Sequence, residues 1–226
     1  MKNPATFRRT AAAVGLVTTA LLMVVSTILA PPFPGNFTDQ LAEIEAAGTS
    51  GTISAVGFAL AQLPFMVAIL GIAHLIRTGS PTLSNLGATL GVIGGFGHSV
   101  YAGVTMVQLS MAADEPNRAA HAAILESVET GPTVAFMAMG LLGTVFGILL
   151  LAIGLWRASV GPRWVPLALG AFLLVEFVGS NLTEWASSLA VLLYVVSFGA
   201  LALTIWRSPI EDWQAVVVSR TPELQH

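Results

Sequence analysis

Long apolar stretches alternate with short polar ones along this sequence. Six of the apolar stretches are about twenty residues long or longer, which is the length that a helix needs to cross a hydrocarbon core about 30 Å thick. The predicted spans are residues 10–30, 53–76, 84–111, 133–156, 164–186 and 188–206. The pattern therefore predicts an all-α fold, a polytopic transmembrane helix bundle of six spans that occupies residues 1–207.

The segments between the spans predict smaller elements. The loops at 31–52 and 112–132 are each long enough for a short surface helix, the first ending at Gly48 and the second covering residues 117–129. The tail, residues 208–226, carries Ile210, Trp213 and Val217 at helical spacing. We therefore expect an interfacial helix over residues 210–218, followed by disorder.

The composition agrees with a membrane protein. Of 226 residues 55% are hydrophobic and 9% are charged, and the mean hydropathy is +0.81. The lipid bilayer is therefore the expected surrounding. Lys2 is the only lysine and the chain has no cysteine, so the sequence offers no basic surface for nucleic acid and no thiolate chemistry.

The basic residues predict an orientation. If six spans alternate, only Arg118 falls on one side, and the other side holds Lys2, Arg8, Arg9, Arg77, Arg157, Arg163, Arg207 and Arg220. Positive residues gather on the cytoplasmic side of membrane proteins. We therefore expect both termini in the cytoplasm and a location in the bacterial inner (cytoplasmic) membrane.

Two ionisable residues lie deep inside predicted spans. Counted from the cytoplasmic ends at about 1.5 Å per residue, His98 lies about 21 Å and Glu176 about 18 Å into the membrane. A charged side chain at that depth costs roughly 2.5 to 3.5 kcal/mol even on insertion scales. The two residues form a hydrogen-bonded pair if the third and fifth spans are adjacent.

Further polar residues lie on the same helix faces as His98 and Glu176, between these two residues and the outer surface. On the fifth span, the polar face consists of Glu176, Ser180, Thr183 and Glu184. On the third span, the polar face consists of His98, Tyr101, Thr105 and Gln108. Gln62 on the second span lies at a similar level. These side chains predict a polar cavity that opens outward and binds a small solute or a proton.

Small residues recur every four positions on the third span. The stripe consists of Gly87, Gly91, Gly95, Ser99 and Gly103. Such a stripe lets a neighbouring helix approach closely, either in the same chain or in a homodimer.

No cofactor or metal is predicted. His74 lies only about 4.5 Å into the membrane, in a different layer from His98, so the two cannot ligate one haem iron. The sequence contains no nucleotide-binding, metalloprotease or hydrolase motif. An enzymatic activity is therefore not the favoured hypothesis.

Three stretches resemble a known class of proteins. They are residues 71–77 (GIAHLIR), 80–98 (SPTLSNLGATLGVIGGFGH) and 161–170 (GPRWVPLALG). They are similar to small multi-span actinobacterial membrane proteins classed as domains of unknown function. The resemblance implies an inner-membrane location and transfers no functional residue.

Three functions stay open. The first is small-solute binding or proton-linked transport through the cavity, by way of Glu176 and His98. The second is an accessory or regulatory membrane subunit, in which a protonated Glu176 and a neutral His98 only fix helix packing. The third is an intramembrane enzyme acting on a lipid or isoprenoid, with Glu176 as general acid and His98 as base.

Overall fold

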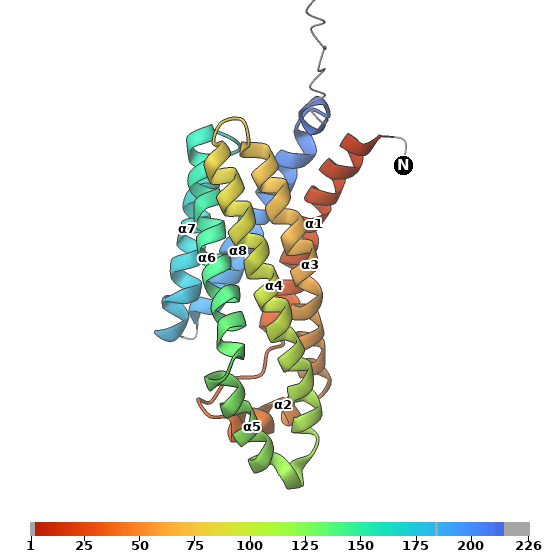
Figure 1. Cartoon of the computed structure of the whole chain (residues 1–226), viewed down its shortest axis with the longest axis vertical. Helices are drawn as coiled ribbons and strands as arrows, with labels where there is room; N and C mark the ends of the chain where they lie inside the picture. The colour runs from red at the N-terminus through yellow and green to blue at the C-terminus, as the bar shows by residue number, and fades with distance from the viewer. Residues whose placement is uncertain (1–2, 184, 215–226) are drawn as a thin grey trace, which may run out of the picture.

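The computed structural model describes residues 3–183 and 185–214, and all regular secondary structure in that part is helical (Figure 1). The α-helices are α1 (Pro4–Ile28), α2 (Phe37–Ala47), α3 (Thr49–Ile76), α4 (Pro81–Ala112), α5 (Arg118–Thr130), α6 (Thr133–Ala158), α7 (Trp164–Phe177) and α8 (Trp185–Arg207). Short 3₁₀ turns are η1 (Glu115–Asn117), η2 (Gly179–Asn181) and η3 (Glu211–Trp213). The all-helical prediction is confirmed.

Six of the described helices pack as a closed ring. The order of contacts around it is α1, α3, α4, α6, α7, α8 and back to α1. Five of these helices, all except α7, are long and apolar enough to cross a membrane. At 14 residues, α7 is only about 21 Å long, short of a core about 30 Å thick.

The predicted helix over residues 164–186 is wrong, because α7 ends at Phe177. The next residues, Val178 to Asn181, are weak helix formers. The hydroxyl of Ser180 donates a hydrogen bond to the backbone carbonyl of Glu176, which competes with continuation of the helix. The chain then passes through η2 before α8 begins at Trp185.

Glycines bring α4 and α6 into backbone contact. A Cβ atom on Gly94 or Gly97 would overlap the backbone of α6, and one on Gly143 would lie 2.6 Å from the backbone nitrogen of Gly94. Side chains larger than hydrogen are thus excluded from this seam. Close packing of this kind holds membrane helices together where lipid removes the hydrophobic drive.

The helices α2 and α5 form a cap over one end of the ring, which we call the cap end (Figure 1). They bury Phe37, Leu41 and Ile44 against Ala122 and Leu125, and Arg118 forms an ion pair with Glu45. Gly48 ends α2 with a φ of +53°, a conformation that glycine adopts without strain. Both predicted surface helices are therefore present.

The other end, which we call the arginine end, carries Arg8, Arg77, Arg157 and Arg207, at the start of α1 and near the ends of α3, α6 and α8. Here the C-terminal segment turns back on the bundle. Trp213 is 2% exposed and its ring stacks on His74 at 4.4 Å.

The predicted interfacial helix over residues 210–218 is therefore wrong for its described part, which is the three-residue turn η3 docked against α1. The docking is polar as well as apolar, because Arg9 donates to the carbonyl of Ser208 at 2.9 Å. Val217 lies outside the described residues.

Candidate functional site

A cavity lies at the centre of the helix ring and receives side chains from all six ring helices. It comprises about 740 Å³ of space between side chains when its open mouth is included, of which about 160 Å³ is enclosed space that holds the centre of a water-sized molecule. Its lining consists of Thr19, Met23, Thr27, Phe58, Gln62, Phe65, His98, Thr144, Ile148, Phe172, Glu176, Phe177, Val191 and Tyr194. His98, Gln62 and Glu176, each singled out in the sequence, thus face one common space.

Glycine contacts on α6 place His98. The imidazole lies against Gly140, where a Cβ would be only 2.8 Å from Cδ2 of the ring. Its Nδ1 is 3.4 Å from the hydroxyl of Thr144, and the ring of Phe58 meets it edge-on at 5.8 Å. The glycine seam that joins α4 to α6 therefore also makes room for the histidine and orients it toward the cavity.

Glu176 is the penultimate residue of α7. Its side chain is half-buried and lines the cavity. Within the described residues, no hydrogen bond or ion pair holds its carboxylate, and no direct bond joins it to His98. The third and fifth spans correspond to α4 and α7, which are not neighbours in the ring, because α6 packs between them. His98 and Glu176 therefore face each other only across the cavity.

Gln62 and Tyr194 add fixed polar groups. The amide of Gln62 donates to the carbonyl of Phe58 at 2.8 Å, which leaves its own carbonyl oxygen as an acceptor. The hydroxyl of Thr19 donates to the carbonyl of Ala61 at 3.2 Å and lies 3.4 Å from the hydroxyl of Tyr194. Since Thr19 has a single hydroxyl proton, Tyr194 is the donor in the second contact.

Aliphatic packing closes the cavity toward the arginine end. From Phe65 in the lining to Ile76 is about 16 Å along α3. This layer of the ring is filled by side chains that are no more than 2% exposed, namely Ile69, Ile72, Ile76, Leu151, Leu155, Leu169, Leu201 and Ile205. The cavity therefore belongs to the half of the ring nearer the cap.

A second cavity lies beneath α2 and comprises about 640 Å³ when its open mouth is included, or about 190 Å³ of enclosed space. Tyr101, Thr105 and Gln108 line it, together with Phe58, which also lines the central cavity. The Phe58 ring meets Tyr101 at 6.4 Å and His98 at 5.8 Å. The polar face predicted on the third span is thus divided between two cavities, with Phe58 standing between them.

The polar face predicted on the fifth span is wrong as a helical stripe. Ser180 and Thr183 follow the end of α7 and are exposed, so neither is in register with Glu176. Neither residue lines the central cavity. Glu184 lies outside the described residues.

The glycine stripe packs mostly within the chain. Added Cβ atoms would meet Leu151 at Gly87, Ile69 at Gly91 and Met66 at Gly95, at 2.6 to 2.8 Å. At the cap-side end of the stripe, Ser99 is exposed and a Cβ on Gly103 would meet nothing within 4 Å. A homodimer through this face stays a prediction.

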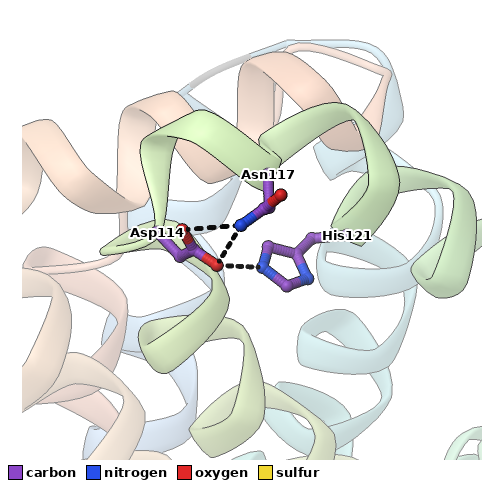
Figure 2. A network of polar contacts seen from close by, with 3 residues as sticks. All are labelled: Asp114, Asn117 and His121. Atoms are coloured by element: carbon purple, nitrogen blue, oxygen red, sulfur yellow. Dashed lines mark hydrogen bonds and ion pairs between the residues drawn. The ribbon is translucent and has the colours of Figure 1, made fainter.

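A separate polar network lies at the cap end (Figure 2). His121 Nε2 is 3.0 Å from a carboxylate oxygen of Asp114, and the side-chain amide of Asn117 donates to both oxygens at 3.0 and 3.1 Å. These bonds, first from His121 and then from Asn117, hold the pKa of Asp114 below its usual value. The network fastens the start of α5 to the end of α4.

Sequence reasoning missed the contributions of α1 and α8. Thr19 is one of several threonines and serines in the first span, Tyr194 lies in a span whose other polar residues are mostly serines, and their contact joins residues 175 positions apart in the chain. Tyr194 is one of two tyrosines in the sequence, and a tyrosine in the middle of a span was the one available signal. Nothing local indicated that it would face Glu176.

Comparison with family models, with curated proteins and with solved structures found no match to this chain. The function is therefore inferred from the geometry of the cavity.

Proposed function

We propose that this protein binds a small solute in the central cavity and admits it from the outer side of the membrane. The observation that carries the proposal is the convergence of His98, Gln62 and Glu176, from three different helices, on one space. In this role Glu176 supplies the charge that exchanges with a proton or a charged solute. His98 and Gln62 supply hydrogen-bonding groups that orient it.

The size and composition of the cavity support binding. Small-molecule sites are mostly apolar concavities of about 300 to 1,000 Å³ with a few placed polar groups. The lining of aromatic and aliphatic side chains with a small set of polar ones fits that description, and the enclosed space of about 160 Å³ limits the bound solute to a small one. Ionisable residues inside membrane bundles commonly mark solute or proton pathways.

The distribution of charge supports an outward orientation. Among the described residues, the arginines other than Arg118 lie at the arginine end, which the positive-inside tendency would place in the cytoplasm. The central cavity then lies in the outer half of the bundle, and the packed layer separates it from the cytoplasm. Transport across the membrane would require this layer to open.

The geometry favours binding over an enzymatic role. The closest hydroxyl–imidazole pair in the cavity, Thr144 and His98, is 3.4 Å apart. A nucleophile and its base usually lie about 2.6 to 3.2 Å apart. The pair is better suited to holding the imidazole in place than to activating the hydroxyl.

Access to the cavity is a direct test, because the chain has no native cysteine. Single cysteines would be placed at Gln62 in the cavity and, as the control, at Ile72 in the packed layer. A membrane-impermeant methanethiosulfonate with a trimethylammonium group would be added to right-side-out and to inside-out membrane vesicles. We expect Gln62→Cys to react only in right-side-out vesicles and Ile72→Cys in neither.

Two results would overturn the proposal. One is a Gln62→Cys variant that reacts as slowly as Ile72→Cys in both vesicle types, since the cavity would then be closed to solutes. The other is reaction in inside-out vesicles alone, since the cavity would then face the cytoplasm.

A further inference from the structure

We infer that the solute of the central cavity is an organic cation that carries apolar groups. This inference rests on the function proposed above and adds the chemical class of the ligand. Among the described residues that line the cavity, Glu176 carries the only formal charge besides any proton on His98, and no lysine or arginine is present. An anion would therefore find no opposite charge there, whereas a cation would.

The state of the Glu176 carboxylate strengthens this choice. A carboxylate that is half-buried and without a partner among the described residues is costly in a low-dielectric interior. A bound cation supplies the missing charge and removes that cost. A strongly hydrated anion would add to it.

Aromatic rings form much of the remaining wall. The lining includes Phe58, Phe65, Phe172, Phe177 and Tyr194, and the rings of Phe172 and Tyr194 are in contact at 5.1 Å. The face of an aromatic ring attracts a cation electrostatically, and sites for quaternary ammonium groups are built in this way. The same rings also bury apolar substituents, so the wall suits a cation with hydrocarbon groups.

A bare metal ion fits less well. Ca²⁺ takes 6 to 8 oxygen ligands, and Mg²⁺ requires a near-octahedral set. The described residues contain no cluster of three or more histidine, aspartate or glutamate side chains that could hold a metal ion. A cavity of about 740 Å³ with a single carboxylate is also far larger than such an ion requires.

Two ions of equal size and opposite charge provide the test. Binding of radiolabelled tetraphenylphosphonium and of tetraphenylborate would be measured by equilibrium dialysis on the purified protein in lipid nanodiscs, with empty nanodiscs subtracted. We expect saturable binding of the phosphonium cation and none of the borate anion. Glu176→Gln should weaken cation binding at least about tenfold, equivalent to about 1.4 kcal/mol.

Matched variants separate the site from the fold. Glu129→Gln removes an exposed carboxylate at the cap and should leave binding unchanged. If Glu176→Gln does not fold, Glu176→Asp, which keeps the charge, should retain cation binding, and Phe58→Leu, which keeps the wall apolar, should weaken it a few-fold.

The outcomes distinguish the two proposals. Equal binding of both ions, or full cation binding by Glu176→Gln, would overturn the organic-cation inference. Binding of neither ion, with Gln62→Cys still labelled from outside, would overturn it too and leave the proposed function standing. Loss of both ion binding and labelling would overturn both proposals.

Discussion

The two halves of the helix ring are built from the same helices but in opposite ways. Toward the arginine end, α3 and α8 contribute Ile69, Ile72, Leu201 and Ile205 to a layer from which water is excluded. Toward the cap, the same two helices contribute Gln62 and Tyr194 to the wall of a cavity. One half is therefore filled by aliphatic packing, and the other half encloses a cavity whose wall includes polar side chains.

The difference follows in part from the length of α7. This helix reaches the packed layer with Val165 and Leu169, both 1% exposed, and ends two turns later at Phe177. Between Phe177 and the cap end, the ring lacks the continuous helix that fills the gap between α6 and α8 toward the arginine end. Glu176 lies at this transition and faces the space that remains.

The largest expected effect comes from truncation in the packed half. Ile69 is fully buried and packs against Gly91 of α4. Ile69→Ala should lower the free energy of unfolding by about 2 to 5 kcal/mol, because it leaves a void that rigid helices cannot fill. Thermal unfolding of the purified protein in detergent would measure the loss.

Met23→Ala is the matched control in the cavity half. Met23 is a partly exposed aliphatic side chain that lines the cavity, so its removal enlarges an existing space. We expect a clearly smaller loss of stability than for Ile69→Ala. Equal losses would show that the cavity half is packed as tightly as the other and would remove the contrast.

Replacement of Glu176 should increase the stability of the protein, by less than Ile69→Ala decreases it. Replacement by leucine removes a half-buried carboxylate that has no partner among the described residues, and an unsatisfied buried polar group costs about 1 to 3 kcal/mol. Glu176→Leu should therefore raise the free energy of unfolding by roughly 1 kcal/mol while it abolishes cation binding, a trade-off seen at functional sites. A destabilised Glu176→Leu protein would instead identify the carboxylate as a structural element.

The sequence predicts the helical fold well because hydrophobic length is a local property. Runs such as residues 53–76 and 133–156 coincide closely with α3 and α6, and Gly48 ends α2 as glycine does elsewhere. The prediction of the fifth span was wrong because hydropathy does not detect where a helix ends inside an apolar region. Gly179 and Asn181 carried that information, and they were outweighed by the leucines and valines around them.

The candidate site was predicted only in part, for a related reason. The depth count correctly brought His98 and Glu176 to one cavity, since helical rise is fixed. No local sequence pattern predicts which helices are neighbours in the ring. The contributions of Thr19 and Tyr194, and the position of α6 between α4 and α7, therefore required the structure.

The smallest expected effect concerns the cap that covers the cavity half. The pKa of Asp114 is lowered by its bonds from His121 and Asn117, so the folded state favours the carboxylate. Its contribution to the stability of α5 is then complete above the unfolded pKa of about 3.9 and is lost as the pH falls through the lowered folded value.

Hydrogen exchange of the α5 amides, corrected for intrinsic rates, would measure the contribution of the Asp114 carboxylate to the stability of α5. In the wild-type protein, protection should decrease as the pH falls below about 4. In Asp114→Asn the carboxylate is absent, so protection of α5 should be reduced already at pH 7 and lack this acid-dependent step. Exchange in α3 and α4 beside the cavity should not change, and if it does, the cap and the cavity half form one cooperative unit.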